Sequence, residues 1–225
     1  MIRSLVLSRT YALASTHVDA NRERDPDNIY LWRFAPRRLD SDQFRDAILA
    51  TSGQLDRDQM AGSIVSKSPE QVVQQGKLSP TSFSEAQMNH RSIYLPIVRN
   101  AMPEVLELFD APDPSLVVGV RDTTTVPAQS LYLMNSPFLV EQSKQFSKRL
   151  LSSSEKTDAD RVALAFRLAL SRKPTASESE QAVSFIRQST QSITAVEKDK
   201  DAIQVRVWAA FCQALFAAAE FRCLE

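Results

Sequence analysis

Glycine is scarce in this sequence, with only 4 residues among 225, whereas an average usage of about 7% would give about 16. Phosphate-binding loops and tight β-hairpins both depend on glycine, because it adopts positive φ angles without steric cost. The shortage therefore argues against a nucleotide-binding loop and against a fold rich in hairpins. It favours helices.

Cysteine is also rare, and the two that are present, Cys212 and Cys223, lie eleven residues apart in one helical pattern. A continuous helix would separate them by about 16 Å of rise, which is beyond the reach of a disulfide. We therefore predict two free thiols, with a loose C-terminus as the alternative that would let them meet. The sequence contains no C-x-x-C-H site for haem attachment and no metal-type cysteine pair.

The chain has no excess of either charge and no long hydrophobic run. Lysine plus arginine equals aspartate plus glutamate at 27 each, so no overall field attracts nucleic acid or an anionic membrane. No segment is long and apolar enough to span a bilayer. The start, MIRSLVLSRT, resembles a signal peptide, but Arg9 interrupts a hydrophobic stretch that would need about seven to fifteen residues. We expect an amphipathic helix there, with Ile2, Leu5 and Val6 on its apolar face.

Helix signals are frequent in the rest of the chain. A helix is predicted to begin at Asp40 or Ser41, to bury Phe44, Ile48 and Leu49, and to end at Gly53, because short polar side chains cap helix starts and glycine favours the C′ position. Thr175 and Glu178 have the spacing of a capping box. Ser68-Pro69-Glu70 is typical of the start of a short helix.

The last third predicts the centre of the fold. Residues 158–171 place apolar side chains on one face, and residues 202–221 are apolar nearly all round, which predicts a central helix. We predict an all-α fold, an irregular helical bundle with one or two short extended segments, at residues 91–98 and 116–120. Residues 1–225 are expected to form one domain, with a helical subdomain over 158–225 as a further division.

Residues 91–138 hold six of the eleven prolines and most of the candidate chemistry. Two acidic residues near an arginine, beside a predicted helix start capped by Thr125, can bind a polar ligand, a sugar or a divalent cation. The local alternative is that the aspartates shape a proline turn, Thr125 caps the helix and Arg121 pairs with an aspartate. The candidate ligand-binding residues are Asp110, Asp113, Arg121, Thr124, Thr125, Gln129 and Asn135, together with Asp122.

Other constellations are weaker. The two histidines, His17 and His90, lie in loop-like surroundings, and a metal site would need them to converge with carboxylates such as Asp19 or Glu85. We expect no metal site, and no G-x-S-x-G elbow suggests a hydrolase. Basic residues around Trp32, at 33, 37 and 38, resemble a nucleic-acid contact, but the zero net charge favours a solvated or partner-facing surface.

Several segments together resemble a known family. The runs RSIYLPIVRNAMPEVLELFDAPDP and TTTVPAQSLYLMNSPF within residues 91–138 are similar to the C-terminal domain of unknown function (domain of unknown function 1553) of planctomycete cytochrome-c-domain proteins. Three further segments support the resemblance: LWRFAPRRLDSDQFRDAILATSGQLD (31–56), ALSRKPTASESE (169–180) and WAAFCQALFAAAEF (208–221). All of these segments occur in the same order as in the family. The resemblance spans most of the chain, and no catalytic residue of the family is established that could be carried over to it.

The resemblance implies a larger, exported protein with a haem-bearing module upstream and this helical domain at its C-terminal end. The chain lacks the upstream part, so we expect a C-terminal fragment. Haem c is implied only for the upstream modules, and no cofactor is expected in this chain. The expected partners are upstream domains of the same protein or a partner protein, without nucleic acid and without membrane insertion. A complete chain without an export signal would be cytoplasmic.

Three functions from different classes follow, of which the third is a standalone metal-binding protein, favoured if the purified protein held a metal. The first is a non-catalytic interaction module that packs against the upstream part, which an exposed apolar surface would favour. The second is an enzyme subdomain, in which residues 110–135 complete an active site for polysaccharide or another polymer and the chemistry comes from upstream. A cleft lined by Asp110, Asp113 and Arg121 would favour that second function.

Overall fold

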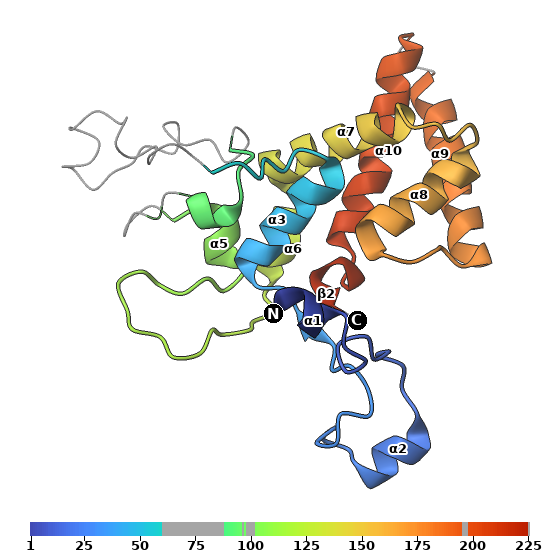
Figure 1. Cartoon of the computed structure of the whole chain (residues 1–225). Coiled ribbons are helices and arrows are strands. Elements are labelled where there is room, and N and C mark those ends of the chain that lie inside the picture. Colours follow the sequence, from blue (N-terminus) through green and yellow to red (C-terminus); the bar gives the residue numbers. More distant parts are fainter. Residues whose placement is uncertain (60–87, 96, 98–101, 195–197, 225) are drawn as a thin grey trace, which may run out of the picture. The chain divides into compact units, whose positions relative to one another are not determined.

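The computed structural model describes residues 1–59, 88–95, 97, 102–194 and 198–224, and these residues are mainly helical (Figure 1). The predicted all-α class with short extended segments is therefore confirmed. The chain divides into two compact units, Met1–Leu39 with Arg222–Glu225, and Asp40–Phe221. The assignment of residues 1–225 to one domain stays a prediction.

The larger unit is a helical bundle, coloured from cyan to red in Figure 1. Among its described elements are two short 3-10 helices, and the last residue of the second belongs to the smaller unit. In chain order the described elements are α3 (Ser41–Ser52), η3 (Ser92–Tyr94), α5 (Glu104–Leu108), α6 (Pro127–Asn135), α7 (Pro137–Leu151), α8 (Asp158–Leu170), α9 (Ala176–Thr194), α10 (Lys200–Ala217) and η4 (Glu220–Arg222).

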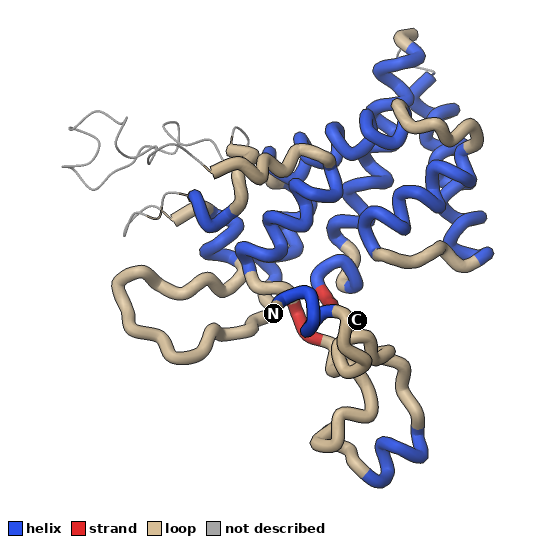
Figure 2. Tube along the Cα trace, viewed as in Figure 1, coloured by secondary structure: helices blue, strands red, loops and turns tan. Residues whose placement is uncertain are grey.

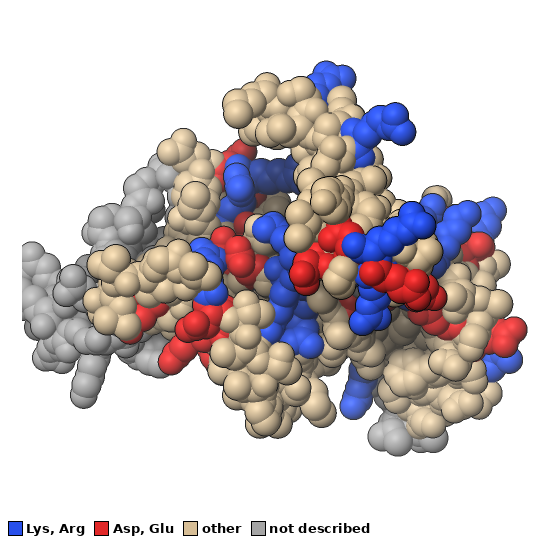
Figure 3. Space-filling model, turned by 90° about the horizontal axis from the view of Figure 1, so that it is seen from below, with Lys and Arg blue, Asp and Glu red and all other residues tan. Residues whose placement is uncertain are grey.

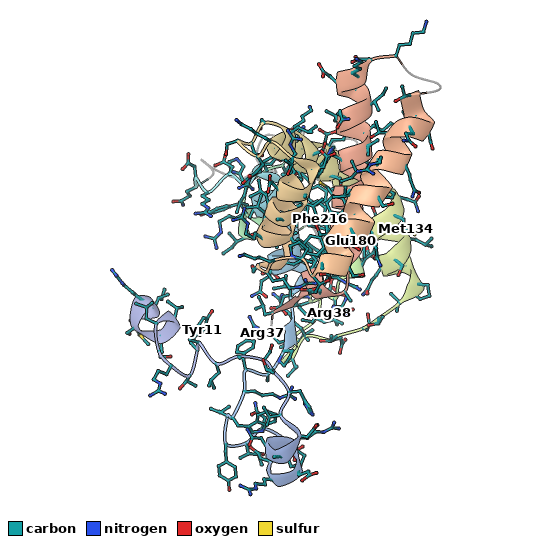
Figure 4. All side chains as sticks on the ribbon, turned by 90° about the vertical axis from the view of Figure 1, so that its right-hand side faces the viewer. Tyr11, Arg37, Arg38, Met134, Glu180 and Phe216 are labelled. Atoms are coloured by element: carbon teal, nitrogen blue, oxygen red, sulfur yellow. The ribbon has the colours of Figure 1, made fainter. Side chains whose placement is uncertain are left out.

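Helix α10 is the centre of the bundle, as the sequence predicts. It packs against α6, α7, α8 and α9, and Trp208, Cys212 and Phe216 on it are fully buried. Figure 4 labels Phe216 inside the bundle. The helix ends at Ala217 rather than at Phe221, because Ala218 adopts an extended conformation (φ −61°, ψ 139°) and the chain then turns into η4.

A row of aromatic rings crosses the core and connects α7, α10, η4, α3, the end of α5 and α6. Neighbouring ring centroids lie between 4.7 and 6.0 Å apart. Such pairs contribute about 0.5–1.5 kcal/mol each beyond the area they bury. In order, the row consists of Phe146, Phe216, Phe221, Phe44, Phe109 and Tyr132.

The predicted helix ends are confirmed at two positions. Asp40 and Gln43 form a capping box at the start of α3, and Gly53 ends that helix with φ 81°. At the start of α9, the Glu178 carboxylate accepts from the Thr175 backbone N–H at 2.7 Å, and the Thr175 hydroxyl accepts from the Glu178 N–H at 3.3 Å. Each box satisfies backbone donors that a helix start otherwise leaves without partners.

The positions predicted for the short extended segments need correction. Within the described part of 91–98, Ser92 begins the 3-10 helix η3, because its N–H and hydroxyl both bind Asp46 Oδ1 at 2.7 Å. The described loop 116–120 forms no strand; an extended run forms a strand only where a second strand offers backbone partners. The helix predicted after Ser68 lies outside the described residues.

One further prediction, on the start of a helix, needs correction. Thr125 is not the N-cap of α6; Val126 is, in an extended conformation (φ −122°), and Pro127 occupies the first helical position, where its missing N–H costs nothing. The N-terminal helix exists as α1 (Ile2–Val6), but none of its side chains is buried. No helix within the described ranges has the length and apolar character needed to cross a membrane.

The smaller unit brings the two ends of the chain together. Besides α1 it contains α2 (Asp19–Arg24), β1 (Arg37–Arg38) and β2 (Cys223–Leu224). The two strands pair antiparallel, with Arg37 opposite Leu224 (red in Figure 2). The Leu39 N–H donates to the Arg222 carbonyl at 2.8 Å and extends the pairing by one bond.

Both cysteines are free thiols, as the sequence predicts. Cys212 of the larger unit is buried and Cys223 of the smaller unit is partly exposed.

Candidate functional site

Asp110 closes a long loop of the larger unit at its base. Its carboxylate accepts from the Thr124 backbone N–H at 2.8 Å and from the Thr124 hydroxyl at 2.6 Å. Asp110 itself has a positive φ of 65°, a conformation that aspartate tolerates better than most residues. The Asp110 side chain thus binds a residue fourteen positions further along the chain. The loop between Asp110 and Thr124 therefore starts and ends at the same place.

Gln129 supports this closure from below. Its side chain is 1% exposed, and its Nε2 donates to the Leu108 carbonyl at 2.8 Å and to the Thr124 carbonyl at 3.3 Å. A buried amide is stable only when it is hydrogen-bonded. Gln129 therefore joins the end of α5 to the start of α6 beneath the Asp110–Thr124 pair, and these three candidates are brought together.

The loop that this closure holds carries apolar side chains outward. We call residues 111–123 the closed loop. Leu116, Val117 and Val120 are 66%, 106% and 82% exposed, and Val118 is 44% exposed. Near the start of the loop, Asp113 Oδ1 accepts from the Ser115 N–H at 2.7 Å, which is a local Asx turn. The loop therefore has fixed ends and an exposed apolar tip. Its exposed valine and leucine side chains contribute nothing to the core, so they are available for contact with another surface.

Arg121 belongs to the closed loop but binds the start of α3. Its guanidinium donates to Asp42 Oδ1 at 2.6 Å and lies 3.6 Å from Asp40 Oδ2. The hydrogen bond to Asp42 raises the pKa of Arg121, with a smaller contribution from the charge of Asp40. The predicted pairing of Arg121 with an aspartate is present, although its partner comes from 79 residues away rather than from Asp110 or Asp113.

The remaining candidates stay apart. Thr125 is exposed and precedes the N-cap of α6. Asn135 is exposed at the other end of that helix, and its Nδ2 donates to the Leu131 carbonyl at 3.0 Å. Asp122 is exposed in the closed loop. The structure thus assembles Asp110, Thr124 and Gln129, and it separates them from Arg121 and Asn135.

The two histidines have separate carboxylate partners. His17 of the smaller unit lies 3.2 Å from Asp19, and His90 of the larger unit lies 3.1 Å from Asp56. Glu85, the other carboxylate considered for a histidine site, lies outside the described residues. No group of three potential metal ligands occurs in the part of the chain that the structure describes. The two histidines therefore have different carboxylate partners, and each belongs to a different unit of the chain.

Sequence reasoning missed Arg45, which among the described residues of the bundle is a charged side chain with no exposed surface. Its side chain is fully buried, and the guanidinium donates to the carbonyls of Met88 and His90 and to the Ser92 hydroxyl. It also lies 5.4 Å from the ring centroid of Phe138. The sequence signal was its place beside the buried stripe of α3, directly after Phe44. Arg45 fixes the backbone around 88–92 against that helix.

A second missed feature is a turn in the smaller unit. The Asp25 carboxylate, 7% exposed, accepts from the backbone N–H groups of Ile29 and Tyr30 at 2.9 and 2.8 Å. The turn displays Ile29 and Tyr30, which are 73% and 84% exposed, together with Leu31 at φ 51°. The sequence signal was Asp25-Pro26-Asp27-Asn28, because aspartate and asparagine bind nearby backbone groups in turns.

The basic residues near Trp32 have local roles. The Arg33 guanidinium lies 5.0 Å from the Trp32 ring centroid, and Arg37 and Arg38 form strand β1. On the face drawn in Figure 3, lysine and arginine lie interspersed with aspartate and glutamate, and neither sign forms a continuous surface.

The comparisons with known proteins place most of the chain in one family. The family model described as PSD1, protein of unknown function (DUF1553), matches residues 1–186. No curated protein and no solved structure matches the chain.

Proposed function

Because the chain belongs to the PSD1 family of proteins of unknown function (DUF1553), we propose that it is an interaction module of a larger, exported, haem-c-associated protein. In this proposal the module carries no cofactor of its own. It packs against an upstream domain of the same protein, and the haem-bearing module lies in that upstream part.

The observation that carries the proposal is the closed loop. Leu116, Val117 and Val120 project into solvent, while Asp110 fixes the two ends of the loop through Thr124. Exposed apolar side chains on a fixed support are typical of surfaces that bind another protein. A pre-fixed loop also loses less conformational entropy when it docks than a loose one does.

Arg121 supports the same proposal from the side of the loop. Its ion pair with Asp42 joins the C-terminal part of the closed loop to the start of α3. An exposed ion pair is worth about 0–1 kcal/mol on its own, so its contribution here is to position the loop. The partner surface that fits this arrangement is an apolar depression with a polar rim.

The alternative, a subdomain that completes a polymer-degrading active site, would need the polar residues of 110–135 to face one cleft. In the described structure Asp110 and Thr124 bind each other, and Arg121 binds α3. These contacts support the interaction module over the enzyme subdomain.

The test begins with the protein in its source cells. An antibody against residues 202–221 is used on fractionated cells, and the same gel is stained for covalently bound haem. We expect a band well above 25.2 kDa in the exported fraction, with haem stain at the same position. A band at 25.2 kDa without haem would contradict the association.

The docking surface is tested by hydrogen–deuterium exchange on the larger protein and on the chain alone. Backbone amides between residues 115 and 122 are expected to exchange more slowly in the larger protein. Amides on the outer face of α9 provide the matched control and are expected to exchange equally in both. Equal exchange of 115–122 in both proteins would contradict the closed loop as the interface.

A further inference from the structure

A groove lies on the surface of the bundle between α7 and α10, apart from the closed loop. Its volume is about 760 Å³. The apolar residues that line it are mostly small. They are Val140, Ala202, Val205, Ala209 and Ala210.

The apolar surface continues beyond the groove onto α6. Gln213 lines the groove, and its Nε2 donates to the carbonyls of Leu133 and Met134 at 3.0 and 2.8 Å. Met134 and Leu131 on that helix are 65% and 60% exposed. Figure 4 shows Met134 on the outer side of α6. The groove therefore opens at one end onto large, exposed apolar side chains.

The groove carries charges of both signs, and they are separated along its length. Asp199 and Asp201 stand at the start of α10, and we call them the acidic end. Lys144 on α7 and Arg206 on α10 form the basic wall. Asp201 and Arg206 are five residues apart, which is about 7.5 Å along a helix. Small apolar residues, Ala202 and Val205, lie between the two sets.

We propose that this groove is the interface of a two-fold dimer, and that its occupant is the same groove of a second copy of this chain. A two-fold axis perpendicular to α10, passing near Ala202 and Val205, makes the two α10 helices antiparallel. The basic wall of each copy then faces the acidic end of the other. Such an interface is isologous, so one surface must be complementary to itself.

The side-chain sizes agree with this arrangement. Interhelical distances of about 8–10 Å depend on the residues at the contact, and alanine on α10 permits the closer values. Two α7–α10 pairs that meet in this way form a four-helix arrangement, a common way of burying such surfaces. A partner with an acidic or basic helix of one sign would face like charges in half of the groove.

The size of the groove sets the expected affinity. Eleven residues line it, whereas a standard interface uses about 20–30 residues on each side. We therefore expect a weak dimer with a dissociation constant of about 1–100 µM. Because exposed charges select the register, high salt should weaken it.

The test is sedimentation equilibrium on the full chain and on a pair of charge-reversal variants. Lys144→Glu with Arg206→Glu makes all four charges of the groove acidic, and Asp199→Asn with Asp201→Lys leaves the groove without an acidic charge. Asparagine keeps the ability of residue 199 to cap α10. Lys173→Glu with Arg187→Glu, which changes two charges outside the groove, is the matched control. Circular dichroism checks that each variant is folded.

We expect the wild type and the control to dimerise equally, and each groove variant to dimerise at least about tenfold more weakly. A 1:1 mixture of the two groove variants should form a heterodimer with nearly the wild-type affinity, because their charges are complementary again. A wild-type chain that remains monomeric at about 200 µM would overturn the proposal. Dimers that persist in both groove variants, or a mixture that stays monomeric, would also overturn it.

Discussion

Asp110 and Thr124 form a closure in which one carboxylate accepts both the backbone N–H and the side-chain hydroxyl of the same residue, at 2.8 and 2.6 Å. Asp110 adopts a positive φ of 65° at the base of the closed loop. Thr124 is the last residue but one before the N-cap of α6. The pair therefore determines where the loop ends and where the helix can begin.

Replacing Asp110 by alanine should open the closed loop. The substitution removes both hydrogen bonds and places alanine at φ 65°, and we expect a loss of about 1–2 kcal/mol in the free energy of unfolding. Trypsin should cleave after Arg121 faster in the variant. Asp113→Ala, which removes only the local bond to Ser115, is the control. Equal effects of the two substitutions on cleavage would contradict the closure.

Replacing Leu116, Val117 and Val120 by serine should leave the isolated chain as stable as the wild type. These side chains are exposed, so their removal takes no apolar area out of the core, and a change within about 0.5 kcal/mol is expected. Thermal unfolding measures this. In the larger protein, the same variant should abolish the protection of amides 115–122. A strong loss of stability in the isolated chain would place these residues in the core instead.

Glu178 should make the stability of the chain depend on pH in the acid range. Hydrogen bonds from Arg172, and then from the Thr175 backbone N–H, lower the pKa of Glu178 from 4.5 to about 2 in the folded chain. The stabilisation is thus complete above the unfolded pKa of 4.5 and declines as the pH falls from there toward 2. Unfolding of the wild type and of Glu178→Gln is compared between pH 2 and 6.

The difference in unfolding free energy between these two proteins should be largest near pH 6 and shrink toward pH 2. Glu180→Gln on the same helix, where the side chain is exposed, is the control and should show no such trend. A difference that stays constant with pH would mean that Glu178 is not charged in its contact with Arg172. Arg172 also donates to both carboxylate oxygens of Glu220, at 2.5 and 2.8 Å.

Arg45 should be one of the least replaceable residues of the bundle. Replacing it by methionine keeps the volume but leaves the buried carbonyl of Met88 without its donor, and we expect a loss of about 3 kcal/mol or more. Lysine should not rescue the variant, because one ammonium cannot reproduce the planar fork of guanidinium. Chemical denaturation measures the loss, with the exposed Arg187→Met as control. A loss below about 1 kcal/mol would contradict the role given to Arg45.

The two cysteines should differ sharply in reactivity. Burial raises the pKa of the Cys212 thiol, and the thiolate is the reactive form. Cys223 is partly exposed. A thiol reagent at neutral pH should therefore modify one cysteine quickly and the second only as the chain unfolds. Mass spectrometry on wild type, Cys212→Ala and Cys223→Ala assigns the sites; fast modification in Cys223→Ala would contradict the burial of Cys212.

The helices were predictable because their signals are local. The capping pairs at Asp40 and Thr175, the glycine at 53 and the apolar character of α10 each act within a few residues. The short extended segments were predicted at the wrong positions for one reason: an extended run forms a strand only with a partner strand, and sequence periodicity does not say whether one exists. The strands that do form, Arg37–Arg38 and Cys223–Leu224, pair across almost the whole chain.

The candidate site was predicted in part, because some of its contacts, like the helix signals, are local. Asp110, Thr124 and Gln129 lie within twenty residues, and their turn and cap chemistry brought them together in the sequence interpretation as well as in the fold. Arg121 was assigned to that cluster, yet it binds Asp42, a contact that exists only once α3 and the closed loop are placed. Arg45 was missed because its partners lie more than forty residues away.

The hydrogen bond from Leu39 to Arg222 has a consequence for protein engineering. It holds the entry and the exit of residues 40–221 side by side, so the helical bundle is a cassette with its two connections in one place. Such a cassette can be grafted into a surface turn of a host protein without separating the ends of that turn. It can equally be circularly permuted, with residues 39 and 222 joined by a short linker and new termini opened between two helices.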